Sequence, residues 1–279
     1  MSKANKRSAW TTVILITLMC AWVVVSVITV QFVVGYLMIH FLGIERFNKP
    51  MWTAVYSAIS YTIALALVII APLLLRREHV RKKLHKSTGD DREKPKLKKS
   101  DLVKRKLLRS EMRMELGLSG LPTWTDIGLS PIGFIVSLFL AAALVGLFSS
   151  FPWFNANEVQ DVGFSLYMSS GDRIIAFLTL VVMAPIAEEI IFRGWLYGKI
   201  RERLTGRVPE AVGTIISILI VSVLFGLVHL QWNVGVNVFA LSVVLCVLRE
   251  ITGTIYAGIL THMIKNGVAF FLLYVLGIR

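Results

Sequence analysis

Charged residues are scarce in this sequence. Only 17% of its 279 residues are Asp, Glu, Lys or Arg, whereas 56% are hydrophobic and the mean hydropathy is +0.70. Because soluble proteins carry about 25% charged residues, this composition excludes an ordinary soluble protein and predicts a membrane protein. Spans of roughly 20 residues then account for most of the chain, so its length indicates the number of membrane helices rather than the number of domains.

Cysteine and the common nucleotide-binding motifs are also scarce or absent. Cys20 and Cys246 lie far apart within apolar runs, which argues against a disulfide framework or a metal-type spacing and makes both of them packing residues. The sequence contains no nucleotide-binding glycine motif, heptad array or internal repeat. These absences leave the apolar runs and the few charges between and within them as the informative features.

One segment holds most of the basic charge. The formal net charge is +13, and residues 76–113 alone contain 16 Lys or Arg against 6 Asp or Glu. This concentration suggests a solvated, partly disordered loop, spanning residues 76–115, that binds anionic lipid. We therefore expect the lipid bilayer and no nucleic acid among the partners.

Seven apolar runs are long enough to span a bilayer. They cover residues 10–44, 51–75, 131–151, 173–197, 211–230, 234–249 and 254–277. The first run is too long for a cleaved signal peptide, whose apolar core has roughly 7 to 15 residues. The predicted fold is all-α, a polytopic membrane helix bundle of about seven transmembrane helices.

The basic residues also predict an orientation, because Lys and Arg in short loops stay on the cytoplasmic side. The amino terminus, residues 76–113 and residues 198–207 are basic, whereas residues 151–172 contain no Lys or Arg. Seven spans alternate consistently with this pattern. We expect an integral, multi-pass protein of the cell membrane, with its amino terminus and basic loop in the cytoplasm.

Ionisable residues within a span are costly and are interpreted first as functional. In EEIIFR, residues 188–193, Glu189 and Arg193 are four residues apart and can form an ion pair on one helix face. Glu188 points about 100° away from Glu189. The arginine can therefore neutralise one glutamate and leave Glu188 for chemistry.

Two later motifs carry imidazoles. In FGLVH, residues 225–229, the ring of Phe225 can pack beside His229, and in HMIKN, residues 262–266, His262 and Asn266 share a helix face. A carboxylate, two imidazoles and an amide on three spans can converge. Glu188 is then a candidate general base for a water molecule that His229 shares, with His229 later giving a proton to a leaving amine.

The other two side chains suit an oxyanion. His262 and Asn266 can donate N–H groups to a carbonyl oxygen as it gains charge, where losing one donor costs about 2.7 to 4 kcal/mol. The set predicts peptide hydrolysis.

Other polar residues in the apolar runs have simpler interpretations. His40 is expected to contact a backbone carbonyl or to lie at an interface, and Asn237 to make an interhelical hydrogen bond. Arg249 and Glu250 are expected to mark a helix end.

The order EExxxR, FxxxH, HxxxN resembles the CAAX protease and bacteriocin-processing (CPBP) family of intramembrane proteases, which is related to the type II CAAX prenyl endopeptidase. The resemblance implies an endopeptidase for membrane-associated or lipid-modified proteins, with its site buried among helices and open to the cytoplasm. It implies that Glu188 and His229 activate the water, that His262 and Asn266 stabilise the oxyanion, and that a supporting set surrounds them, comprising Glu189, Arg193 and Phe225.

The resemblance also divides the chain. Residues 116–279 are expected to form a CPBP-type protease domain with its motif core at 173–277, after a two-span segment at 1–75 and the basic loop.

Whether a metal takes part stays open at the sequence level. Glu188, His229 and His262 would meet the ligand count of a catalytic zinc site, and the family has been described both as metalloprotease and as glutamate-dependent. However, HExxH is absent, and Asn266 suits an oxyanion better than a metal. We expect no cofactor, with zinc as the alternative.

Two further questions are left by the sequence. A proton-coupled transporter could use the same Glu and His as a relay, and a non-catalytic bacteriocin-immunity or scaffold protein is the third possibility.

The expected depths of the motif residues in the membrane conflict. At 1.5 Å per residue, His229 lies about 27 Å beyond Ala211, whereas Glu188 lies only about 16 Å from Lys199. Either the helix continues past residue 198, or the fifth span is tilted and enters late.

Overall fold

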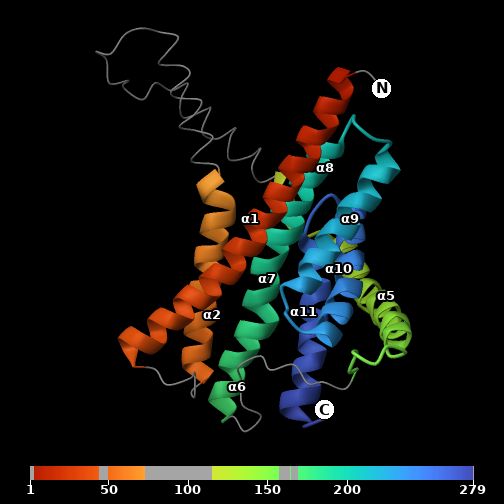
Figure 1. Cartoon of the computed structure of the whole chain (residues 1–279). Helices are drawn as coiled ribbons and strands as arrows, with labels where there is room; N and C mark the ends of the chain where they lie inside the picture. Colours follow the sequence, from red (N-terminus) through yellow and green to blue (C-terminus); the bar gives the residue numbers. More distant parts are fainter. Residues whose placement is uncertain (1–2, 44–49, 73–114, 157–163, 165–168, 279) are drawn as a thin grey trace.

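The computed structural model describes residues 3–43, 50–72, 115–156, 164 and 169–278. These residues form helices joined by turns, with no strand among them, and seven of the helices are long and apolar enough to cross a membrane. The all-α, multi-pass fold is therefore confirmed (Figure 1). The basic residues 76–113, with the lipid contact expected of them, lie outside the described residues.

The chain contributes its helices in order. The first pair is α1 (Lys3–Leu42) and α2 (Pro50–Leu65), which continues as the π-helical segment η1 (Ala66–Ile70); α5 (Trp124–Phe148) follows. One long helix then comprises α6 (Ser170–Phe177), η2 (Leu178–Met183), α7 (Ala184–Glu189), η3 (Ile190–Tyr197) and α8 (Gly198–Leu204). The last helices are α9 (Glu210–Leu227), α10 (Trp232–Thr252) and α11 (Tyr256–Phe270), continued by η4 (Phe271–Val275).

The long helix α6–α8 occupies the middle of the bundle in Figure 1, with α1 and α2 on one side of it and α9, α10, α11 and α5 on the other. α5 packs against α10 and α11, and α2 packs against α6 and α7. The amino terminus lies at the same end as the α8–α9 turn, and the carboxyl terminus lies at the opposite end. This arrangement places both faces of α7 against other helices.

The start of α5 differs from the expected start at residue 131. The helix begins at Trp124 and continues through Pro131. The reason is a capping box: the Thr123 hydroxyl accepts from the Asp126 N–H at 3.2 Å, and the Asp126 carboxylate accepts from the Thr123 N–H at 2.7 Å. The cap, rather than the hydrophobic run, sets the helix boundary.

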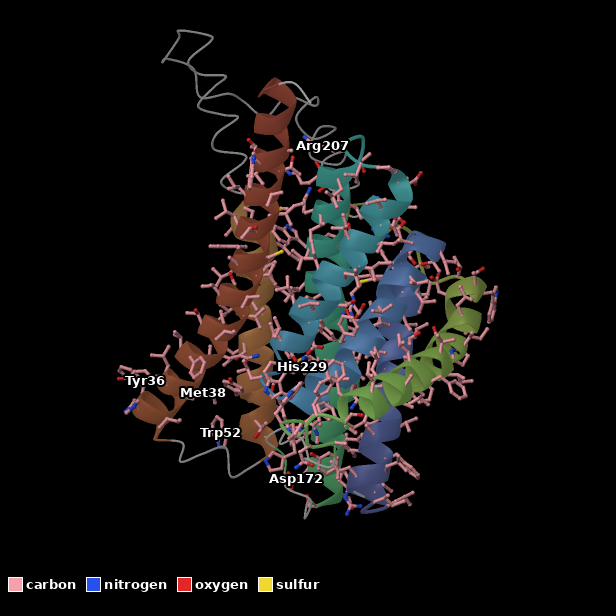
Figure 2. The ribbon with its side chains drawn as sticks, turned by 45° about the vertical axis from the view of Figure 1, so that its right-hand side comes forward. Tyr36, Met38, Trp52, Asp172, Arg207 and His229 are labelled. Carbon is pink, nitrogen blue, oxygen red and sulfur yellow. The ribbon has the colours of Figure 1, made fainter. Side chains whose placement is uncertain are left out.

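The conflict in depth is resolved by the length of the fourth span. The helix was expected to end near residue 197 but continues to Leu204, and α9 begins at Glu210. Counted from this turn, Glu188 lies 16 residues away and His229 lies 19 residues away, or about 24 and 28 Å at 1.5 Å per residue. In Figure 2, His229 lies between Arg207 at one end of the molecule and Asp172 at the other.

The turn between α9 and α10 places His229. The fifth span was expected to reach residue 230, but α9 ends at Leu227, so that prediction is too long. The two helices lie very close here. A Cβ on Gly226 would lie 2.8 Å from the Gly235 carbonyl oxygen, and a Cβ on Gly235 would lie 3.1 Å from the Gly226 carbonyl oxygen. Leu230 completes the turn with φ +56°, in the left-handed region.

The simpler interpretations have mixed outcomes. The prediction of an interhelical hydrogen bond for Asn237 is wrong, because its amide donates to the Asn233 carbonyl of the same helix at 3.0 Å. Arg249 and Glu250 do mark a helix end, since α10 ends at Thr252. The ring of His40 lies 4.2 Å from that of Tyr36. Cys20 is partly buried, Cys246 is buried, and both are free thiols.

Candidate active site

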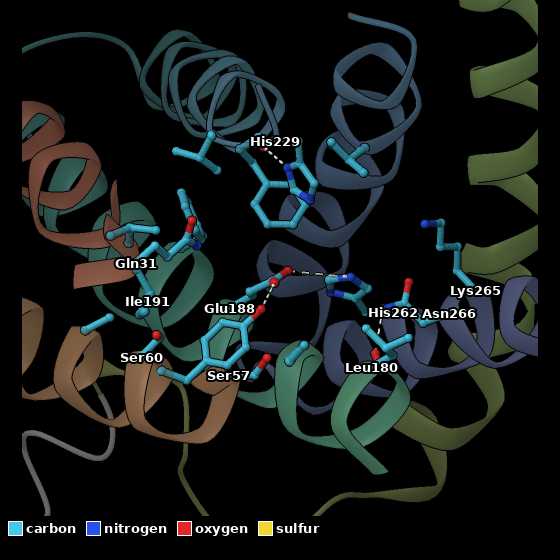
Figure 3. A pocket seen from close by; sticks show the side chains of 18 of the residues that line it. Gln31, Ser57, Ser60, Leu180, Glu188, Ile191, His229, His262, Lys265 and Asn266 are labelled. Carbon is cyan, nitrogen blue, oxygen red and sulfur yellow. Dashed lines mark hydrogen bonds and ion pairs between the residues drawn. The ribbon is translucent and has the colours of Figure 1, made fainter. Parts of the chain in front are cut away.

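One cavity brings the three motifs together. Its volume is about 540 Å³, within the range of small-ligand sites. It is lined by side chains from α1, α2, η2, α7, η3, α9, the α9–α10 turn, α10, α11 and η4. Among them are all four residues that the sequence assigns to catalysis: Glu188, His229, His262 and Asn266 (Figure 3).

Glu189 and Arg193 form the predicted ion pair behind the cavity. Arg193 donates from a terminal guanidinium nitrogen to Glu189 Oε1 at 2.8 Å, and both side chains are fully buried. The guanidinium carbon also lies 4.3 Å from the centre of the Phe225 ring, within range of a cation–π contact. The prediction that the arginine offsets this glutamate, rather than Glu188, is confirmed.

His262 lies between the two adjacent glutamates. Its Nδ1 is 3.1 Å from Glu189 Oε1, and its Nε2 is 3.8 Å from Glu188 Oε2. An ionised carboxylate only accepts, so Nδ1 carries a proton and donates to Glu189. Glu189 therefore fixes the ring, and Nε2 faces Glu188. A Cβ on Gly258 would lie 3.1 Å from Glu189 Oε2, so a glycine makes room for this carboxylate.

The tautomer of His229 follows from its partner. Nδ1 lies 2.7 Å from the Phe225 carbonyl oxygen, which can only accept a hydrogen bond. The proton of the neutral ring is therefore on Nδ1, and Nε2 is left as the basic nitrogen. Burial lowers the pKa of His229 below its ordinary value, and the charge of Glu188 and the bond to Phe225 oppose this shift. The predicted packing of Phe225 is confirmed, with ring centres 5.1 Å apart.

Asn266 is tied to the long helix. Its amide nitrogen donates to the Leu180 carbonyl of η2 at 2.9 Å. This bond uses one of the two amide N–H groups, and the side chain lines the same cavity as His262 (Figure 3).

The local backbone around the glutamates is unusual. η2 ends at Met183 and η3 begins at Ile190, so π-helical segments flank the short helix α7 that carries Glu188 and Glu189. Such segments occur often at functional sites.

Two residues of the cavity were missed by the sequence analysis. The Tyr61 hydroxyl donates to Glu188 Oε1 at 2.7 Å, and Lys265 lines the cavity beside Asn266. A signal existed for each. Tyr61 belongs to a polar stripe at helical spacing within an apolar run, formed by Tyr56, Ser57, Ser60 and Tyr61, and Lys265 is the single Asp, Glu, Lys or Arg in the run 254–277.

The donors do not form a metal site as they are arranged here. Within the described part of the chain, no three His, Cys, Asp or Glu side chains gather closely enough to hold a metal ion. His229 and His262 each engage Nδ1 with an oxygen acceptor and keep Nε2 free, and Glu188 accepts from Tyr61.

Comparison with known proteins supports the resemblance. Residues 170–268, about a third of the chain, match the model of a family described as type II CAAX prenyl endopeptidase Rce1-like. The matched segment contains all three motifs and the helices that carry them. No curated protein and no solved structure gives a significant match.

Proposed function

We propose that this chain, whose residues 170–268 belong to the Rce1-like type II CAAX prenyl endopeptidase family, is an intramembrane endopeptidase. It hydrolyses peptide bonds of membrane-associated or lipid-modified proteins. The observation that carries the proposal is the single cavity lined by the carboxylate, both imidazoles and the amide of the three motifs.

The first step is the activation of water by Glu188 and His229. Glu188 takes a proton from the water as its oxygen attacks the carbonyl carbon, which gives a tetrahedral intermediate. The Tyr61 hydroxyl, 2.7 Å from Glu188 Oε1, holds the carboxylate and leaves Oε2 for the water. His229 presents Nε2 to the same water, because its Nδ1 proton is held by a carbonyl.

The second step stabilises the oxyanion and breaks the C–N bond. Asn266 has one amide N–H to offer the oxyanion, since the other donates to Leu180. His262 has an N–H on Nε2 when the ring is doubly protonated, with Glu189 and Arg193 behind it. As the intermediate collapses, the proton taken from water passes to the amine nitrogen, and the other product has a new carboxyl group.

We also propose the orientation that the basic residues predict. The amino terminus and the end of α8 lie at the same end of the bundle (Figure 1), and α8 and the turn after it carry the basic residues Lys199, Arg201, Arg203 and Arg207. This end would face the cytoplasm. The loop 76–113 would lie there as well and contact anionic lipid.

The test is cleavage by purified protein in detergent, with a lipid-modified or membrane-derived peptide as the substrate. We expect product from the wild type and a loss of roughly 10²- to 10⁴-fold in Glu188→Ala and in His229→Ala. A chelator should leave the wild-type rate unchanged, because the proposed mechanism uses no metal. Equal cleavage by both variants and the wild type would contradict the mechanism.

Experiments with the wild type and Glu188→Ala also distinguish the two alternative functions. A proton-coupled transporter would move a substrate across sealed vesicles without cleaving a peptide bond, and an immunity or scaffold protein would keep its phenotype in Glu188→Ala.

A further inference from the structure

Lys265 is a charged residue of the cavity to which the hydrolytic mechanism gives no role. It lies on α11, three residues after His262, so the two side chains are neighbours on the helix surface, and Asn266 follows it directly in sequence. It lines the same cavity, and Figure 3 shows it beside Asn266, with His262 between this pair and Glu188 in the view. The hydrolytic centre therefore has a cation along one edge.

The ammonium group of Lys265 is short of partners. The side chain is partly buried, and within the part of the chain that the structure describes it makes no hydrogen bond or salt bridge. Glu188, the carboxylate that lines the same cavity, is already bonded to Tyr61 and faces His262. A lysine among membrane helices is costly unless it faces a counter-charge or a ligand, so its three N–H donors point to a ligand.

The chemistry of that ligand follows from the cavity. Three N–H donors and a positive charge suit an anion. Part of the wall is apolar, with Val27, Val238 and Leu273 among its residues, so a peptide with apolar side chains beside one anionic group suits the cavity. A substrate carbonyl held by His262 and Asn266 would place its next residues beside Lys265, because an extended chain advances about 3.3 to 3.6 Å per residue.

We propose that Lys265 forms a carboxylate-binding subsite that selects substrates with an anionic carboxylate within a few residues of the scissile bond. This inference rests on the proposed function and adds a specificity-determining residue to it. The carboxylate can be the free end of a peptide or the side chain of Asp or Glu, and both offer the same two oxygens to the ammonium group.

The test uses peptides that share one scissile bond and differ only in charge next to it. One has a free carboxyl terminus close to the bond, the second is its amide, the third is the amide with an Asp in that position, and the fourth has Asn instead. We expect the wild type to cleave one or both of the carboxylate peptides with a kcat/KM about 10- to 100-fold above that of their neutral partners.

The variants separate recognition from folding. Lys265→Met should bring the ratio between charged and neutral peptides close to one, whereas Lys265→Arg should keep most of it. Lys199→Met is the matched control, since Lys199 lies outside this cavity and pairs with Glu115 and Glu202, and it should keep the wild-type ratio. A wild-type ratio near one, or an unchanged ratio in Lys265→Met, would overturn the subsite.

Binding distinguishes failure of the subsite from failure of the proposed function. Fluorescently labelled peptides are titrated onto Glu188→Gln and onto Glu188→Gln combined with Lys265→Met. Tighter binding of the acid than of the amide to the first variant, and loss of this preference in the second, would support the subsite. Absence of cleavage by the wild type would refute the endopeptidase but not the subsite. Equal binding of acid and amide to Glu188→Gln would refute the subsite, whatever the cleavage result.

Discussion

At the residue scale, two adjacent glutamates take different roles because their neighbours differ. Glu189 is fully buried and shared by Arg193 and His262, so it holds other side chains in place. Glu188 lines the cavity and contacts Tyr61 and His262. Breaking the Glu189–Arg193 pair would leave an uncompensated buried charge, and the chain therefore needs both members to keep His262 in position.

The contact between Tyr61 and Glu188 leads to a first prediction. Tyr61→Phe removes the hydroxyl that donates to Glu188 at 2.7 Å, and a hydrogen bond to a charged group contributes about 1.5 to 3 kcal/mol. We expect kcat/KM for peptide cleavage to fall about 10- to 100-fold with little change in thermal stability. Tyr56→Phe is the control, because its hydroxyl donates to the Gln31 backbone; an equal loss in both variants would contradict a specific role for Tyr61.

The environment of His229 predicts the pH dependence of cleavage. Burial lowers the pKa of His229 below its ordinary value, which is about 6.5, and the proposed mechanism uses the neutral ring. Protonation at low pH removes the basic Nε2, so kcat/KM should rise with pH through an acid limb whose midpoint lies below pH 6.5. A rate profile for the wild type measures this midpoint, and a value above pH 7 would show that burial does not control this histidine.

At the element scale, the close crossing of α9 and α10 positions the turn that carries His229. A Cβ on Gly226 would meet the Gly235 carbonyl oxygen at 2.8 Å, and backbone atoms at this distance can move apart only if the helices separate. The left-handed Leu230 then reverses the chain within a few residues. The position of His229 therefore depends on two glycines, Gly226 and Gly235, to which the proposed mechanism gives no chemical role.

Replacement of one of these glycines tests this dependence. Gly226→Ala should lower the free energy of unfolding by about 1 to 3 kcal/mol, as overpacking does, and should reduce cleavage as well because His229 moves. Denaturant unfolding in detergent and kcat/KM give the two readouts. Gly128→Ala is the matched control, since a Cβ there would meet nothing within 4 Å, and a comparable loss in this variant would refute the explanation.

Contacts within one helix could be predicted from the sequence pattern, whereas the ends of the helices could not. Helical spacing was enough for the Glu189–Arg193 pair and for the packing of Phe225 on His229, because both are contacts within one turn of a helix. The length of the α6–α8 helix and the turn at His229 were not predictable from hydropathy, since polar residues such as Lys199 and Arg201 continue the helix beyond the apolar run. The start of α5 was missed because a cap at Thr123 outweighed the Gly and Pro residues after it.

At the scale of the whole molecule, the site is shared between segments far apart in the chain. The match to the family covers residues 170–268, yet Tyr61 comes from α2, and other residues of α1 and α2 form one wall of the cavity. The sequence could not predict this wall, because a contact between residues 61 and 188 depends on how helices pack rather than on any spacing. The amino-terminal helices thus complete the cavity that the motif helices begin.

The basic residues predict how the whole molecule is oriented. Thr205→Cys and Ser149→Cys, introduced separately into a chain without Cys20 and Cys246, place a thiol at an exposed position directly after α8 and directly after α5, respectively. A membrane-impermeant maleimide should label position 149 in intact cells and position 205 in inverted vesicles, because the basic end faces the cytoplasm. The reverse pattern would contradict the orientation.

In the proposed mechanism, Glu188 directs a water molecule onto a peptide bond. The most direct measurement is cleavage of a membrane peptide in water labelled with oxygen-18, with the products analysed by mass spectrometry. We expect one labelled oxygen in the new carboxyl terminus and almost no product from Glu188→Ala, whereas Tyr56→Phe should behave as the wild type. Labelled product formed at the wild-type rate by Glu188→Ala, or no product from the wild type, would contradict this mechanism.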